Sequence, residues 1–305
     1  MKLIMKKIII LIALINLCFP IWLDALLIPH KASTLALSGA GIGGFVDASL
    51  NPASLYNIDT YMGMSSNKGY IDAKGQKSTW VFGDEAIRFI SVESFGVDEI
   101  PVHEDNDGTP EGFTSTDWLA FDFGSNINLN KFFNDTKGFN IGYNMKLNYI
   151  KLDTERYWGY TFDFGMNKII NEKINLGLVL KNLGQEYSVN RKINIDDYSY
   201  LGLGLAYSTN IIKRNKFYID ADVYFDCIYS KQNNIFKLAV DTQFPYVNLM
   251  FGTSFVNGDH EYKDFSYGMS FKFKNWMVLF GSSIHENASI GSPTSFEIRN
   301  FFNLD

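Results

Sequence analysis

Long apolar segments are absent from the sequence after its first 25 residues. No later stretch approaches the roughly 20 consecutive apolar residues that a transmembrane helix requires, and the mean hydropathy of the chain is -0.06. A helical membrane protein is therefore excluded. Strands that alternate apolar and polar residues average to neutral hydropathy, so a membrane β-barrel agrees with these values.

Proline and cysteine are scarce as well, and the chain carries no net positive charge. The 305 residues include 7 Pro and 2 Cys, against 26 Phe, 17 Tyr and 5 Trp, and the formal net charge is -6. The aromatic content excludes collagen-like and disordered chains, and the charge offers no basic surface to a nucleic acid. Loss of an N-terminal signal segment would leave Cys227 alone, so no internal disulfide is expected.

Histidine is rare and dispersed along the chain. The 4 His residues form no spaced ligand pair, so we expect neither a built metal site nor the constellation of a hydrolase, and we predict that the protein is not an enzyme. The run Gly39–Gly44 matches the glycine spacing of dinucleotide-binding sites, but no strand precedes it and no helix follows it. No cofactor is expected.

The N-terminal segment is typical of a secretory signal peptide. A basic start precedes an apolar run from Ile8 to Leu17, and Ala25 supplies the small residue of a cleavage site. The alternative is an uncleaved membrane anchor, for which the run is short. The expected domains are a signal peptide at 1–25, an N-terminal segment at 26–58 and a β-domain at 59–305.

Apolar residues recur at every second position after about residue 59. In 138–150, for example, Phe139, Ile141 and Tyr143 alternate with asparagine and glycine. The pattern predicts fourteen strands, at 60–69, 76–83, 86–97, 114–127, 138–150, 157–167, 174–184, 197–208, 216–229, 235–243, 247–256, 262–273, 276–284 and 294–303. Many are longer than the ~5–6 residues usual in soluble proteins.

The bulky, aromatic faces of these strands favour a membrane barrel over a soluble all-β protein, the alternative fold. Aromatic residues also gather near strand ends, as the girdles of a membrane barrel would require; these are Tyr149, Trp158, Tyr207, Tyr229, Trp276 and Phe302. We predict an all-β fold, a transmembrane antiparallel barrel of about 14 strands in the bacterial outer membrane. Its partners would include outer-membrane lipid and lipopolysaccharide.

The two faces of each strand should differ in how well they tolerate substitution. Polar substitution of an outward residue such as Leu203 is expected to be costly, whereas Gly165 and Asn144 on the inward face should tolerate change. The segment 86–97 lacks clean alternation, because it mixes Arg88 and Glu93 with apolar residues. It is expected either to bulge or to touch something inside the barrel.

An acidic run at residues 103–108 resembles a calcium-binding loop in part, with Gly108 at the sixth position. The first position is His103 rather than Asp, and the twelfth would be Thr114 rather than Glu. The run is interpreted as a solvated outer loop. The alternative is loose divalent-ion binding by Glu104, Asp105 and Asp107.

The most specific motif lies just before the first strand. It combines a glycine-rich stretch, an acidic–small pair and an Asn-Pro-Ala-Ser-Leu pentad; the residues that carry it are Gly39, Gly41, Gly43, Gly44, Asp47, Asn51, Pro52 and Ala53. The motif resembles the N-terminal signature of the PorV/PorQ family of outer-membrane barrels, which is related to the FadL-like long-chain fatty acid transporters. Glycine permits tight turns, and Pro52 holds Asn51 extended.

The resemblance implies that residues 26–58 form a hatch inside the barrel; a simple periplasmic extension is the alternative. It also implies a passive conduit for small hydrophobic molecules. The alternative function is an accessory or shuttle barrel that binds secreted proteins in a type IX-like secretion system, as some members of the family do.

Overall fold

The computed structural model describes residues 31–69, 73–83, 88–102, 112–128, 138–152, 155–188, 199–214, 217–231, 233–258, 261–287 and 291–302. The predicted signal peptide at 1–25 and the acidic run at 103–108 lie outside these ranges. Among the described residues, no helix has the length and apolar character needed to cross a membrane.

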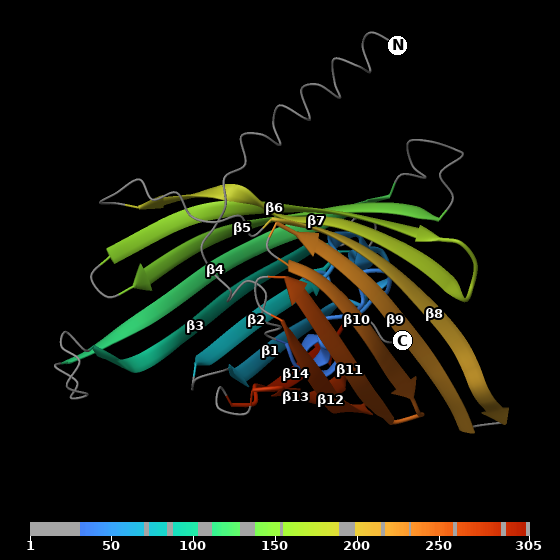
Figure 1. Ribbon diagram of the computed structural model, residues 1–305. Coiled ribbons are helices and arrows are strands. Elements are labelled where there is room, and N and C mark those ends of the chain that lie inside the picture. Colours follow the sequence, from blue (N-terminus) through green and yellow to red (C-terminus); the bar gives the residue numbers. More distant parts are fainter. Residues whose placement is uncertain are drawn as a thin grey trace, which may run out of the picture.

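The chain forms a closed barrel of fourteen antiparallel strands, in which β1 pairs with β14 (Figure 1). The strands are β1 Tyr61–Lys68, β2 Lys74–Phe82, β3 Arg88–Val102, β4 Gly112–Asn128, β5 Phe139–Leu152, β6 Glu155–Ile169, β7 Ile174–Ser188, β8 Tyr200–Arg214, β9 Phe217–Ser230, β10 Asn233–Gln243, β11 Val247–Gly258, β12 Tyr262–Phe273, β13 Trp276–His285 and β14 Thr294–Phe301. The predicted strand number is confirmed. The segment 98–113, expected to be a loop, instead extends β3 to Val102 and begins β4 at Gly112.

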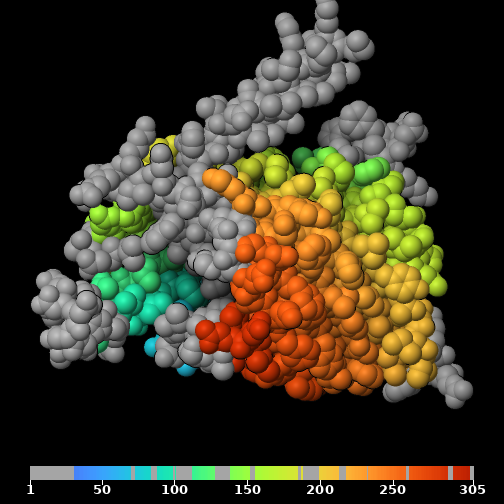
Figure 2. Space-filling model, viewed as in Figure 1, coloured from blue at the N-terminus to red at the C-terminus, as the bar shows by residue number. Residues whose placement is uncertain are grey.

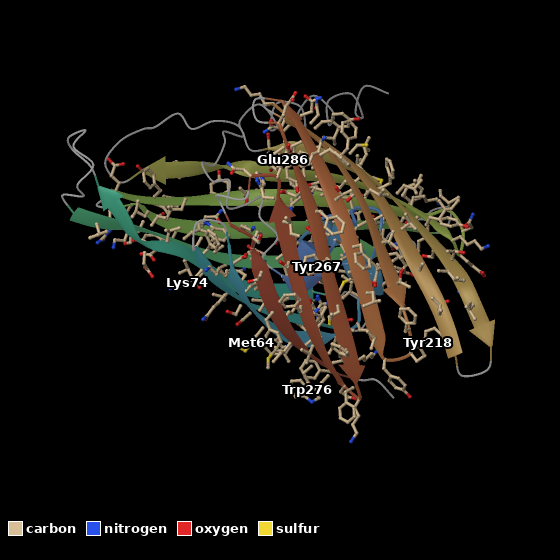
Figure 3. All side chains as sticks on the ribbon, turned by 60° about the horizontal axis from the view of Figure 1, so that its bottom comes forward. Met64, Lys74, Tyr218, Tyr267, Trp276 and Glu286 are labelled. Atoms are coloured by element: carbon tan, nitrogen blue, oxygen red, sulfur yellow. The ribbon has the colours of Figure 1, made fainter. Side chains whose placement is uncertain are left out.

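The strands run between two ends of the barrel. We call the end where β1 begins and β14 ends the turn end; its connections include 170–173, 244–246 and 274–275, although the short connections 153–154 and 231–232 lie at the opposite end. The opposite end is the loop end. In Figure 3, Trp276 and Tyr218 lie at the turn end and Glu286 lies at the loop end, with Tyr267 between them.

The outward face of the barrel is apolar, as the alternation predicts. Leu203 is 45% exposed and Phe225 is 53% exposed, whereas the inward neighbours Gly204 and Asp226 are buried. The six girdle aromatics predicted from the sequence are all exposed, and Figure 3 shows Met64 and Trp276 on the outer surface. Side chains of this kind cover a surface that faces lipid.

The irregular segment 86–97 both turns a charge inward and precedes a bulge. Glu93 is 1% exposed and accepts a hydrogen bond from Lys77, which lies opposite it on the neighbouring strand β2. Phe89 on the same strand packs with Ala48 and Leu55 inside the barrel, as one of the two interpretations expected. The register of β3 against β4 shifts between Val97 and Ile100, so the bulge follows the segment rather than lying within it.

Candidate functional site

The lumen is occupied by residues 31–58, which we call the hatch. It contains a short helix, α2 at Ala32–Ala36, and a 3-10 helix, η2 at Pro52–Asn57. Helix α2 packs on β11–β14, and η2 packs on β4–β6, so the hatch touches opposite parts of the wall. Its ribbon lies within the barrel in Figure 1, and the face drawn in Figure 2 is formed largely by later strands. The predicted hatch inside the lumen is present.

The Asn51–Pro52 pair begins η2, and Asn51 has the extended conformation that the sequence predicts. Asn51 is extended, with φ -148° and ψ 114°, and its side-chain oxygen accepts a hydrogen bond from Ala53 N at 3.0 Å. Its amide nitrogen donates to Ile42 O at 2.9 Å and to Asn167 Oδ1 on β6 at 2.8 Å. The side chain, which is fully buried, thus caps the helix and ties it to the wall.

The glycines of the motif serve two different purposes. Gly39 and Gly41 have φ values of 67° and 129°, which favour glycine because a side chain would be strained there. Gly43 and Gly44 are required by close approach instead. A Cβ on Gly43 would lie 2.8 Å from the backbone of Gly204, and one on Gly44 would overlap the ring of Tyr224.

The wall meets the hatch through its own glycines, which we call the glycine ring. At each position an added Cβ would overlap the hatch: Gly142 against Pro52, Gly165 against Asn51, Gly177 against Ile42, Gly204 against Gly43, Gly252 against Leu37, Gly268 against Ala36 and Gly281 against Ala32. Three pairs lie directly opposite each other on neighbouring strands: Gly142 and Gly165, Gly177 and Gly204, and Gly268 and Gly281. The expected tolerance of Gly165 is not supported, because its position has no room for a side chain.

We expect Gly142→Val to loosen η2. The new side chain would collide with the backbone of Pro52 and Ala53, and overpacking of this kind costs about 1–3 kcal/mol. Limited proteolysis of the assembled barrel should then cleave the hatch faster. Gly112→Val is the matched control, because an added Cβ there meets none of the described residues within 4 Å; equal cleavage of both variants would contradict the role of the ring.

A buried ionic cluster fastens the start of the hatch. Lys31 Nζ lies 2.7 Å from Asp47 Oδ2 and donates to the Tyr61 hydroxyl at 3.1 Å. Arg299 on β14 donates to Glu297 at 2.7 Å and to Ser33 Oγ at 2.6 Å. The sequence pointed to Asp47 but missed its partners, although charged residues on the inward face of a strand are a signal for buried pairing.

The ion pair of the hatch stays charged at neutral pH. Burial raises the pKa of the Asp47 carboxyl, but the Lys31 ammonium and the Arg299 guanidinium outweigh it, so the pKa lies below its usual value. Burial lowers the pKa of Lys31, but Asp47 outweighs it, so that pKa is raised. A carboxyl with a lowered pKa stabilises the fold above its unfolded pKa and loses this only as pH falls through the folded value. The pair therefore stays charged at neutral pH, and its contribution is lost only as pH falls through the lowered pKa of Asp47 or rises through the raised pKa of Lys31.

A belt of alternating charges fills the β2–β7 side of the lumen. Lys77 lies 2.9 Å from Glu93 and 3.6 Å from Asp122, Lys146 lies 3.9 Å from Asp122, and Lys181 lies 3.7 Å from Asp163. Three positive and three negative side chains compensate one another there.

The lumen differs on the two sides of the hatch. Toward the loop end, Ile42 packs with Val179 and Ile228, with Tyr200 and Ile235 against them; we call this the loop-side cluster. Toward the turn end lies a cavity of about 640 Å³, the vestibule, whose wall includes Phe45, Val46, Tyr224, Met250 and Met277. Polar and charged side chains such as Asp222, Asp241 and Arg299 also line the vestibule, so only the loop-end side of the hatch is distinctly apolar.

Comparison with solved structures places this architecture among known barrels. The chain superposes on the CymD monoaromatic hydrocarbon channel with a TM-score of 0.61 and 12% identity, covering 90% of this chain and 98% of that one. The toluene transporter TodX of Pseudomonas putida gives 0.60 and 11%, covering 90% and 98%. The toluene transporter TbuX of Ralstonia pickettii gives 0.56 and 9%, covering 89% and 98%.

The fold is shared with FadL-like hydrocarbon channels. At these identities the likeness concerns the fold alone. A scan against protein-family models finds no match, and a search of curated proteins finds none either.

The sequence-predicted residues divide between the hatch and the outer loop. All eight motif residues, from Gly39 to Ala53, come together inside the lumen. Glu104, Asp105 and Asp107 lie outside the described residues, so ion binding there stays a prediction. Within the described part of the chain, no group of three or more His, Cys, Asp or Glu side chains is placed to hold a metal ion.

Proposed function

We propose that the protein is an outer-membrane conduit for small apolar molecules. The observation that carries the proposal is a closed barrel whose lumen holds a hatch, with the apolar loop-side cluster on one side of the hatch and a cavity of mixed polar and apolar lining, the vestibule, on the other. Apolar side chains inside such a lumen offer contacts to apolar solutes. The similar structures named as monoaromatic hydrocarbon channels and toluene transporters support the same class of solute.

The proposal includes the cellular placement. Residues 1–25 would act as a signal peptide, 26–58 as the hatch domain and 59–305 as the barrel domain, which would face outer-membrane lipid and lipopolysaccharide. The similar structures are named as a channel and a transporter rather than as enzymes, and this favours a transport role.

Toluene uptake tests the conduit. Cells that lack their own hydrocarbon channels should take up labelled toluene faster when they carry this barrel, because lipopolysaccharide slows apolar solutes. Ile228→Arg should remove the gain, since it places a charge in the loop-side cluster. An uptake rate equal to that of cells with an empty vector, despite an assembled barrel, would contradict the conduit.

The motif at Gly39–Leu55 supports a second candidate, membership of the PorV/PorQ family and an accessory role in protein secretion. Its residues form one connected unit, in which Ser54 Oγ donates to Gly44 O at 3.0 Å and Asn51 joins Ile42 to η2. Copurification of secreted proteins with the barrel from its native membrane, without any toluene uptake, would favour this candidate over the conduit.

A further inference from the structure

The vestibule carries an excess of negative charge. Among the described residues that line it, the carboxylates are Asp59, Glu172, Asp222 and Asp241, and the cations are Lys173 and Arg299. The charge of Arg299 is already compensated, because its guanidinium donates to Glu297 Oε1 at 2.7 Å. A cavity of this composition favours a positively charged occupant.

Two of these carboxylates face each other on neighbouring strands. Asp222 on β9 lies opposite Asp241 on β10, and like charges in that position destabilise a sheet. The side chains that reach them are neutral. Gln243 Nε2 donates to Asp222 Oδ2 at 2.8 Å, and Ser208 bonds the same carboxylate. Asn248 bonds Asp241, whose buried Oδ1 accepts no hydrogen bond within the described part of the chain.

The other buried carboxylates of the lumen are paired. Each has a cation or a backbone N–H as its partner: Asp47 has Lys31, Glu93 has Lys77, Asp122 has Lys77 and Lys146, Asp163 has Lys181, Glu297 has Arg299, and Asp226 has the N–H groups of Gly41 and Ile42. The chain thus compensates its most buried charges from within. Asp222 and Asp241 depart from this rule at the wall of a cavity, where a counter-charge can enter from outside.

A further acceptor without a donor lies on β7. Asn175 is 7% exposed and lines the vestibule. Its Nδ2 donates to Gly43 O, but its Oδ1 is buried and accepts no hydrogen bond from the described residues. A buried oxygen in this situation requires a donor from water or from a ligand. The vestibule therefore offers oxygen acceptors at two separate places.

The spacing of these two places suits an elongated molecule. Strands β7 and β9 are two positions apart in the barrel, which separates Asn175 from Asp222 by about 10 Å across the sheet. The residue opposite Asn175 on β8 is the small Ala206. Phe45 and Val46 also line the cavity, so methylene groups have apolar side chains to pack against.

Small molecules can enter the vestibule from the turn end. Asn171, Glu172 and Lys173, in the connection between β6 and β7, are exposed and also line the cavity. The volume of about 640 Å³ lies within the range of about 300–1,000 Å³ that is usual for ligand sites.

We infer that the vestibule binds a linear organic diamine or polyamine, with one ammonium group at Asp222 and Asp241 and a second at Asn175 Oδ1. An ammonium group donates hydrogen bonds and accepts none, so it matches the unpaired oxygens of this wall. Bonds between an ammonium and a carboxylate are charge-assisted and are the stronger kind. The inference does not rest on the proposed conduit, because it concerns a cation bound by the purified barrel rather than the passage of apolar solutes.

Calorimetric titration of the assembled, full-length barrel in detergent tests the ligand class with three molecules of equal chain length. Hexamethylenediamine should bind. Hexylamine should bind about fivefold more weakly, because it leaves Asn175 Oδ1 without a donor, and hexanediol should not bind measurably, because it carries no charge. Binding of hexanediol as tight as that of the diamine, or equal affinities of the two amines, would overturn the inference.

Substitution of the two carboxylates tests the site. Asp222→Asn and Asp241→Asn should each lower the affinity for hexamethylenediamine by about tenfold, because each removes a charge-assisted bond. Asp220→Asn is the matched control, since Asp220 lies two residues from Asp222 on β9, accepts a hydrogen bond from Asn210 Nδ2 at 2.8 Å and is outside the lining of the vestibule. It removes the same charge but should change the affinity by less than about twofold.

Different migration of unboiled and boiled samples on a denaturing gel verifies that each variant is assembled. An affinity that is unchanged in both Asp222→Asn and Asp241→Asn would show that the carboxylates hold no ligand. A loss in Asp220→Asn as large as that in Asp222→Asn would show diffuse attraction to a negative wall instead of a site. Either result overturns the inference, whatever the outcome of the toluene experiment.

Discussion

Deletion of residues 31–50 should convert the barrel into an open aqueous pore. The deletion removes α2, the glycine-rich turn at 39–46 and the ion pair of Lys31 and Asp47, while the closed ladder from β1 to β14 keeps its own hydrogen bonds. Barrels with an unfilled lumen of comparable size conduct water and ions, so planar-bilayer conductance should rise by about an order of magnitude or more. The full-length protein should conduct poorly.

The control is a test of assembly on the same samples. Both proteins should migrate differently in unboiled and boiled form on a denaturing gel, which is the mark of an intact barrel. A full-length protein that conducts as well as the deletion, with both barrels assembled, would show that residues 31–50 do not close the lumen.

An arginine on the outer face should be the most costly single substitution for the barrel. Phe225 on β9 is 53% exposed and lies between the two aromatic girdles. Phe225→Arg should lower the free energy of unfolding in lipid by about 2–4 kcal/mol, because the guanidinium would sit near the bilayer midplane.

Tyr229→Arg on the same strand supplies the matched control. Tyr229 lies one residue before the loop end of β9, where the headgroups begin, so the cost should fall to about 0–1 kcal/mol. Unfolding by denaturant in lipid vesicles measures both values. Equal losses at the two positions would mean that β9 does not cross the membrane at this depth.

The wall of the barrel could be predicted from the sequence because strand periodicity is local. Alternation over residues 138–150 identifies β5 without any knowledge of its neighbours, and the same holds for the other strands. The predicted strand ends were wrong where polar residues continue a strand. Strand β3, for example, extends through Asp98 to Val102. Solvated strand ends carry no apolar alternation, so periodicity cannot mark where they stop.

The site was less predictable because its contacts join distant parts of the chain. The extended conformation of Asn51 was predicted correctly, because it depends on the adjacent residue Pro52. The bond between Ser33 and Arg299 spans 266 positions, and the contact of Gly165 with Asn51 depends on which inward glycine meets which part of the hatch. The register of the strands and the path of the hatch depend on contacts between distant residues, so no local sequence pattern predicts them.

The placement of α2 constrains how such a molecule can be made. The helix belongs to the first part of the chain to be synthesised, but it packs on β11–β14, among them the last strand, which must pair with β1 to complete the cylinder. The bonds from Arg299 on β14 to the hatch can form only when that final strand arrives. The final seating of α2 therefore depends on the same strand that closes the seam, so the plug and the cylinder are completed by one element.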